Sequence, residues 1–396
     1  MSTDKRKHIF IRCCYGYFVS GMAVLVIGAI LPSIISEAGI SFLAAGGLLS
    51  AMAVGNLICS FVFPVLVSFL KRRGAITILT ALTPLCLVGL SLLPPLPVMY
   101  GLMLLYGLIR GAVTITNNSD ISDIYEEEAS GKLNLLHCSF AVGAFLAPFL
   151  TALMMEAGLG WKSVIYLLAV LTATSAISYG TMDDTLLESR AEILERRAKG
   201  RQAGKQADLT GNNTFFHSFQ FYCISFLLFF YLGVENCING WFVTYLQNTG
   251  VMSAAYATAL VSVTWLVIMV GRLFCAALSK KMGHSSIILM NAVGSAICFF
   301  VLISTKSLPV ITVALLCFGF FLAGIYPTSI AGAGPLIHGS TLGMAVLTAI
   351  SAVGGIVTPQ LVGGVADHVG IVAAIGILAI NVVVVVLLAA IIKKKY

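Results

Sequence analysis

The sequence predicts an all-α polytopic membrane protein with twelve transmembrane helices in two pseudo-symmetric six-helix bundles. Three observations carry this prediction. Hydrophobic residues make up 59% of the 396 residues and charged residues only 10%, whereas a soluble domain has about 25% charged residues. The apolar stretches run for about 20 residues, the length that a helix needs to cross a bilayer. One polar segment divides these stretches into two sets of six.

The twelve predicted spans follow one another with short connections. A chain of this length cannot bury so much apolar surface in water, so its solvent must be lipid, where a helix satisfies its own backbone groups. Several stretches exceed the minimum for one crossing, which predicts tilted or protruding helices. The expected spans are 9–35, 42–70, 75–93, 97–118, 133–156, 161–182, 217–246, 253–279, 284–304, 308–332, 340–365 and 370–392.

Basic residues are concentrated in every second loop. The alternate loops hold only Lys162 and Lys306. Because cytoplasmic loops carry the excess of Lys and Arg, both termini are predicted to be cytoplasmic, with the chain in the cell membrane. The net charge of +7 reflects this asymmetry and not a nucleic-acid partner. The basic positions include Lys5, Arg6, Lys7, Lys71, Arg72, Arg73, Lys132, Lys280, Lys281 and Lys393 to Lys395.

Residues 183–216 separate two blocks of similar length. Acids and bases balance in number in this segment, and its apolar residues at helical spacing predict a cytoplasmic surface helix. The predicted organisation is an N-terminal bundle at 1–182, a linker at 183–216 and a C-terminal bundle at 217–396. Two six-span halves around a polar linker are typical of transporters that rock about a central site.

Nothing in the sequence supports catalysis. There is no phosphate-binding glycine loop and no zinc pattern, and the ten cysteines lie scattered, mostly inside spans. We therefore expect no enzyme, no cofactor and no metal site. Transport would be driven by a gradient.

Three stretches carry a family resemblance. They are Leu133 to His137 followed by Gly143 and Pro148; Gly233 to Glu235 with Gly240, Trp241 and Thr244 to Leu246; and Gly324 to Thr328 followed by Gly354, Gly355 and Pro359. With these motifs the chain resembles the major facilitator superfamily, and within it the fucose–proton symporter and related sugar-transporter branch. The resemblance implies that spans one, four, seven and ten line a central cavity.

The chain also departs from that pattern. Gly28 and Val113 stand where fucose symporters have acids in helices one and four, and Lys71 stands where the family's loop signature has aspartate. Proton coupling therefore does not follow from the resemblance alone.

Glu235 is the main candidate for a functional charge inside a span. A charge near the bilayer centre costs about 2.5–3.5 kcal/mol, so it usually has a role or a partner. Tyr231 and Asn239 share the face of Glu235, and Asn236 and Trp241 flank it. Aromatic, carboxylate and amide groups together suit a sugar, with helix packing as the alternative interpretation.

Arg110 is the second candidate. It shares one helix face with Thr114 and Asn117. Either Arg110 pairs with Glu235, or it holds an anionic group of the substrate while Glu235 takes the proton, because guanidinium binds carboxylate or phosphate bidentately.

The remaining candidates are cavity, relay and gate residues. We expect Trp265, Tyr326 and Gln360 to reach the cavity, with an aromatic belt at the membrane interface as the alternative for the two aromatic residues. His137 is expected to pack in the bundle or relay protons. The acidic residues after span four would pair with the basic turn after span two at an inner gate, with a solvated acidic turn as the alternative. The predicted gate residues are Arg72, Arg73, Asp120, Asp123 and Arg272.

The resulting hypothesis is a secondary transporter that moves a sugar or an acidic sugar derivative by alternating access. We expect uptake by a monomer, with proton coupling through Glu235. An efflux antiporter for drugs or metabolites and an uncoupled facilitator are the alternatives. The asparagine- and arginine-bearing lining argues against efflux, while the two missing acids keep the uncoupled facilitator as an open alternative.

Overall fold

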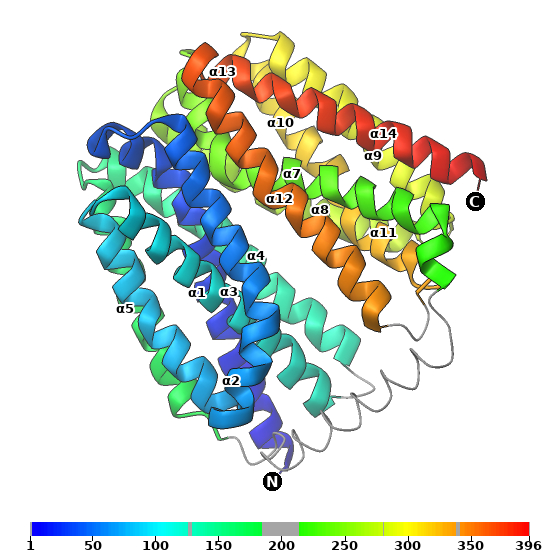
Figure 1. The fold of residues 1–396 in the computed structure, drawn as a ribbon. Coiled ribbons are helices and arrows are strands. Elements are labelled where there is room, and N and C mark those ends of the chain that lie inside the picture. Colours follow the sequence, from blue (N-terminus) through cyan, green and yellow to red (C-terminus); the bar gives the residue numbers. More distant parts are fainter. Residues whose placement is uncertain (1, 126–128, 184–213, 280, 338–340, 396) are drawn as a thin grey trace. The chain divides into compact units, whose positions relative to one another are not determined.

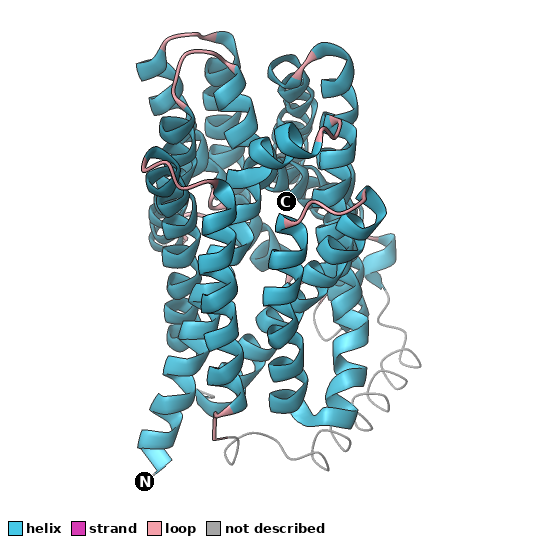
Figure 2. Cartoon of the chain, turned by 90° about the vertical axis from the view of Figure 1, so that its left-hand side faces the viewer, coloured by secondary structure: helices cyan, strands magenta, loops and turns pink. Residues whose placement is uncertain are grey.

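The computed structural model describes residues 2–125, 129–183, 214–279, 281–337 and 341–395. These ranges form helices joined by short loops, and no strand occurs in them (Figure 2). The chain divides into two compact units: unit 1 comprises residues 1–40 and 47–198, and unit 2 comprises residues 41–46 and 199–396. The surface helix predicted within 183–216 lies outside the described residues.

Unit 1 contains five long helices. Its first helix contacts three of the others, α3, α4 and α5, and so forms the centre of the unit. The helices are α1 (Ser2–Ala38), α2 (Phe42–Ser91), α3 (Leu96–Tyr125), α4 (Ala129–Glu156) and α5 (Trp161–Gly180).

Helix α2 supplies two membrane crossings. It has 50 residues, about 75 Å of helix, whereas the apolar layer of a bilayer is about 30 Å thick. Lys71 breaks it with φ 58 and ψ 166, and Figure 1 shows the helix turning back there. The break falls where the charged residues Lys71 to Arg73 interrupt the apolar run, so the predicted spans 42–70 and 75–93 meet at this point.

Glycines allow neighbouring helices of unit 1 to approach closely. A Cβ on Gly107 of α3 would stand 1.9 Å from the carbonyl oxygen of Met52 on α2, and one on Gly143 of α4 would stand 2.0 Å from that of Phe18 on α1. Small residues at such crossings let backbones touch, which is how helices gain packing energy in lipid.

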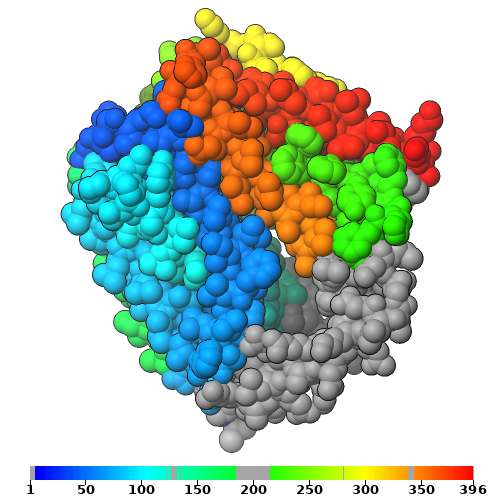
Figure 3. Space-filling model, viewed as in Figure 1, coloured from blue at the N-terminus to red at the C-terminus, as the bar shows by residue number. Residues whose placement is uncertain are grey.

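Unit 2 is built around α7, which contacts α8, α11, α12 and α14. In the space-filling view of Figure 3, α12 (orange) and α14 (red) lie against α7 (green). The elements are η2 (Thr214–His217), α7 (Phe219–Asn248), α8 (Ala254–Leu278), α9 (His284–Ser304), α10 (Leu308–Leu322), α11 (Ile325–Ala333), α12 (Thr341–Val369), α13 (Ile371–Ala374), η3 (Ile375–Ile377) and α14 (Leu378–Lys395).

The predicted span 308–332 is interrupted in the structure. Helix α10 ends at Leu322 and α11 begins at Ile325. Gly324 lies at the interruption and Pro327 follows it; glycine and proline both weaken a continuous helix. The whole stretch Leu308–Ala333 is still long and apolar enough to cross a membrane.

The surface of the helices requires lipid. Large apolar side chains such as Phe61 and Val170 are 71% and 61% exposed, a pattern that water does not tolerate over a whole surface. Eleven described helical segments are long and apolar enough to cross a membrane. Because α2 crosses twice, they provide the twelve predicted spans.

Candidate functional site

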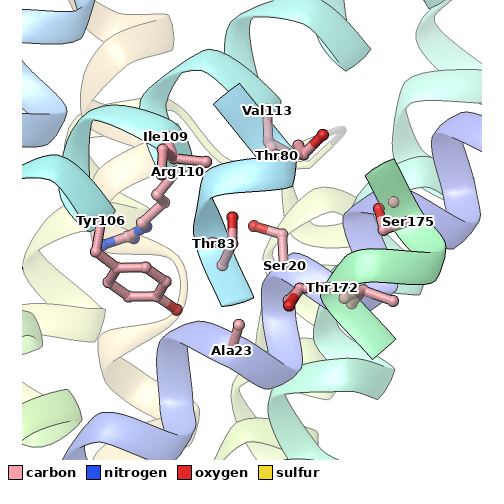
Figure 4. A pocket seen from close by; sticks show the side chains of 12 residues that line it. Ser20, Ala23, Thr80, Thr83, Tyr106, Ile109, Arg110, Val113, Thr172 and Ser175 are labelled. Atoms are coloured by element: carbon pink, nitrogen blue, oxygen red, sulfur yellow. The ribbon is translucent and has the colours of Figure 1, made fainter. Parts of the chain in front are cut away.

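A small polar pocket lies inside unit 1, between α1, α2, α3 and α5. Its volume is about 30 Å³, room for one or two water molecules and far below the roughly 300 Å³ or more of a typical ligand site. Figure 4 shows hydroxyl groups from three helices around this space, with Arg110 and Tyr106 on α3 at one side. The polar lining residues are Ser20, Thr80, Thr83, Tyr106, Arg110, Thr172 and Ser175.

The predicted face of Arg110, Thr114 and Asn117 is divided between different surroundings. Arg110 lines the pocket, while the Thr114 hydroxyl donates to the Arg110 carbonyl at 3.1 Å. Asn117 is fully buried and accepts a hydrogen bond of 3.0 Å from Tyr179 on α5. Its contact with substrate therefore stays a prediction, as do those of Arg110 and Thr114.

Unit 2 holds a second polar cluster, centred on Glu235. Tyr231, one turn before Glu235 on α7, is buried and donates a hydrogen bond to the carboxylate. Arg272 of α8 lies 3.7 Å from Glu235 Oε1. Tyr326 of α11 places its ring 6.0 Å from that of Tyr231. The cluster thus joins a carboxylate, a phenol and a guanidinium from two adjacent helices, flanked by a second tyrosine.

Arg272 has a partner that the sequence interpretation did not name. The sequence predicted a gate residue, and gating by Arg272 stays a prediction. In the structure Arg272 lies on the helix next to that of Glu235, and its long side chain extends to the Glu235 carboxylate. Its side chain is 43% exposed, whereas that of Glu235 is 17% exposed.

Two other predicted binding residues hold α7 to α12. Asn236 donates to the carbonyl of Gly355 at 2.9 Å, and the buried indole of Trp241 donates to the carbonyl of Pro359 at 3.0 Å. Both groups therefore have a packing role, and their contact with substrate stays a prediction. Asn239 is partly buried, and its Oδ1 has no donor among the described residues.

The first turn of α2 belongs to unit 2 and is capped from α12. Asp367 accepts hydrogen bonds from the backbone N–H groups of Phe42 (2.6 Å) and Leu43 (3.0 Å). The predicted cavity residue Gln360 donates to the Leu43 carbonyl at 3.3 Å. A carboxylate at a helix N-terminus satisfies unpaired N–H groups and complements the helix dipole.

Arg72 forms the ion pairs predicted for the inner gate. Its guanidinium lies 2.9 Å from Asp120 and 2.6 Å from Asp123. Asp120 is fully buried, so the alternative of a solvated acidic turn is wrong for this residue. Arg73 instead donates to the carbonyl of Gly180 on α5. Gating by these residues stays a prediction.

His137 lies on α4 beside Tyr17 of α1, with the two rings 5.3 Å apart. This edge contact is a packing contact between α1 and α4, and proton relay by His137 stays a prediction.

Sequence reasoning missed two residues that the structure places in polar surroundings. Asp367 caps α2, and Tyr106 lines the pocket of unit 1. Asp367 offered a signal, because a carboxylate is unusual near the end of an apolar span. No sequence signal distinguishes Tyr106 from an ordinary aromatic core residue. Trp265, expected at the cavity wall, is buried and carries an N–H without an acceptor among the described residues. In the described residues no group of three or more potential ligands could hold a metal ion.

Comparison with known proteins places these clusters in a wider context. Residues 13–337 match the family model described as the Major Facilitator Superfamily. The mouse sodium-dependent glucose transporter 1A is 23% identical over 340 residues, covering 78% of each chain. The Saccharomyces cerevisiae bypass of stop codon protein 6 is 24% identical over 394 residues, covering 91% of this chain and 77% of the relative.

Solved structures share the fold at low sequence identity. A D-xylose-proton symporter superposes with a TM-score of 0.79 at 14% identity, covering 98% of this chain and 97% of the other. The nucleoside transporter NupG superposes with a TM-score of 0.77 at 13% identity, covering 98% and 100%.

Proposed function

Because the chain belongs to the major facilitator superfamily, a family of membrane transporters and not of enzymes, we propose that it takes up a sugar or an acidic sugar derivative by alternating access. Its relatives include a protein named as a glucose transporter, and a D-xylose symporter shares its fold. These relatives support a sugar as the class of substrate. The polar clusters in the two units support the choice of the residues that would bind it.

The Glu235 cluster is the observation that carries the proposal. Glu235 lies in the middle of α7, inside a span, where an ionised group is costly unless it has a function or a partner. Its hydrogen bond from Tyr231 and its ion pair with Arg272 stabilise the charged form. A proton taken up by Glu235 would cancel that ion pair, and the half-exposed Arg272 would then turn to water. We propose that Glu235 couples uptake to protons in this way.

Arg110 determines the charge of the substrate in this proposal. A guanidinium inside a span suits a carboxylate or phosphate on a sugar. The pocket that Arg110 lines in unit 1 is too small for a sugar ring. The ring itself must therefore bind elsewhere, and only a charged or hydroxyl group of it would meet Arg110.

Transport by a Glu235→Gln variant in proteoliposomes tests the coupling. The amide keeps the shape and cannot release a proton, so we expect exchange of labelled sugar against unlabelled sugar to continue while accumulation driven by a proton gradient is lost. Glu37→Gln is the control, because Glu37 lies in the last turn of α1 and pairs with Lys162. Accumulation by the Glu235 variant equal to that of the unmodified protein would refute coupling and favour the uncoupled facilitator.

A thermal-stability screen of the purified protein tests the substrate class. A ligand that binds only the folded state stabilises it by about 2.7 kcal/mol at 100 times its Kd, and so raises the melting temperature. Stabilisation by an acidic sugar that Arg110→Ala abolishes and Arg110→Lys weakens would assign the anion to Arg110. Stabilisation by neutral hexoses would assign Arg110 a structural role, and stabilisation by lipophilic cations alone would replace sugar uptake by efflux.

We also propose a monomer in the cell membrane with both termini cytoplasmic. The excess of basic residues in alternate loops supports this orientation. Labelling of single cysteines placed at Lys162 and at Lys281 by an impermeant reagent tests it, since only the first is expected to react in intact cells.

A further inference from the structure

The chain has three tryptophans, and their indole N–H groups differ in what they meet. Trp161 donates to Glu37 at 2.7 Å, and Trp241 donates to the carbonyl of Pro359 at 3.0 Å. Trp265 is only 6% exposed, yet its Nε1 has no acceptor in the described part of the chain. A buried donor without a partner is costly, so it usually marks a place where water or a ligand supplies the acceptor.

The helix geometry turns Trp265 toward α7. Trp265 and Arg272 are seven residues apart on α8, which is two turns, so they share one face of the helix. Arg272 reaches Glu235 on α7. The face of α8 that carries Trp265 is therefore the face directed at the Glu235 cluster.

Trp265 also stands at the level of the polar residues of α7. The two helices contact each other and are joined by only five residues, so α8 runs back antiparallel to α7. Asn239 and Glu235 lie nine and thirteen residues before the end of α7 at Asn248. Trp265 lies eleven residues after the start of α8 at Ala254, between those two levels.

Asn239 complements Trp265 chemically. Its Oδ1 is a buried acceptor that has no donor among the residues that the structure describes, and Trp265 offers a buried donor without an acceptor. A hydroxyl both donates and accepts, so it supplies the acceptor that the Trp265 N–H lacks and the donor that Asn239 Oδ1 lacks. Neighbouring hydroxyls of a sugar satisfy both groups at once, whereas a lipophilic cation does not.

We propose that Trp265 is a specificity-determining residue of the substrate site: its Nε1 donates to a sugar hydroxyl while Asn239 Oδ1 accepts from the same or an adjacent hydroxyl. This inference rests on the proposed transport of a sugar and names the contact that selects it. The indole ring also offers an apolar surface to the sugar ring, so it combines packing with a directed hydrogen bond.

The test uses the purified full-length protein and a set of monosaccharides with their monodeoxy analogues. Trp265→Phe keeps an aromatic ring and removes the N–H. We expect it to weaken binding of the parent sugar about tenfold, near the upper end for one neutral hydrogen bond. One deoxy analogue should bind the variant and the unmodified protein equally, which identifies the hydroxyl that Trp265 contacts. The melting temperature without sugar should stay the same or rise, because an unsatisfied donor is removed.

Trp161→Phe is the matched control. It removes an N–H that donates to Glu37, so it should lower the melting temperature and leave the pattern across the deoxy sugars unchanged. If Trp265→Phe does not yield folded protein, Asn239→Ala tests the acceptor side, where discrimination at the same or the adjacent hydroxyl should disappear.

Two outcomes separate this inference from the function on which it rests. The inference is overturned if the unmodified protein binds sugar and Trp265→Phe shows the same pattern across the deoxy sugars. Where Trp265→Phe does not fold, an unchanged pattern in Asn239→Ala overturns it. Either result leaves the proposed function standing. Failure of every monosaccharide to bind the unmodified protein refutes the proposed function, and the inference falls with it.

Discussion

Replacing Asp120 by Asn is expected to destabilise unit 1 more than the loss of any exposed ion pair in that unit would. Asp120 is fully buried and Arg72 has a side-chain exposure of only 12%. Removing one partner of a buried pair leaves the other charge uncompensated, which costs about 3–5 kcal/mol. Asp123 remains 2.6 Å from Arg72 and supplies part of that compensation. We therefore expect the lower end, about 3 kcal/mol.

The exposed pair between Lys5 and Asp183 provides the comparison. Its side chains are 40% and 45% exposed, and exposed pairs contribute about 0–1 kcal/mol. Lys5→Ala should therefore leave the melting temperature of the detergent-purified protein nearly unchanged. Asp120→Asn should lower it by several degrees, at roughly 2–4 °C per kcal/mol for a unit of this size.

A double substitution separates the buried charge from the ion pair. Changing Arg72 to Met and Asp120 to Leu removes both charges, and replacing a buried pair by apolar residues is often neutral or stabilising. The double variant should therefore melt above Asp120→Asn. Equal melting of Asp120→Asn and the unmodified protein would refute the reasoning, since the carboxylate would then contribute no more than an exposed one.

Two further substitutions test packing and capping by the same melting assay. Gly107→Ala places a Cβ 1.9 Å from a backbone oxygen of α2, so it should separate α2 from α3 and cost about 1–3 kcal/mol of stability. Gly101→Ala on the same helix is the control, because its Cβ meets nothing within 4 Å and the change should be tolerated. Equal effects of the two would contradict the close crossing. Asp367→Ala removes both acceptors at the start of α2 and should cost about 0.5–2 kcal/mol, whereas Asp367→Glu should restore part of the loss. A melting temperature unchanged in Asp367→Ala would show that water replaces the cap.

Local chemistry explains why the sequence predicted the spans so well. A helix in lipid must be apolar along its whole length, so hydropathy alone marks its position. The charged run Lys71 to Arg73 likewise marked the turn between two crossings, and the structure breaks α2 there. The partners of Arg72 were predictable because the alternating basic and acidic loops place both on one side of the membrane.

The partners inside the bundle were decided by the tertiary structure. Glu235 and Arg272 are 37 positions apart in the sequence, and only the crossing of α7 and α8 brings them within 3.7 Å. Sequence periodicity predicts which residues share one helix face, and it does not predict which face of the next helix meets them.

The same limit applies to the polar groups that find a partner and those that do not. Trp241 and Trp265 are both buried aromatics in apolar spans, and their sequence surroundings do not separate them. The structure gives Trp241 an acceptor at Pro359 and gives Trp265 none within the described ranges. Composition and period therefore determined the class, the spans and the candidate charges of this protein. Helix packing alone determined which of those charges meet and which buried donors have no acceptor among the described residues, because hydrogen bonds depend on distances between segments that the chain order does not contain.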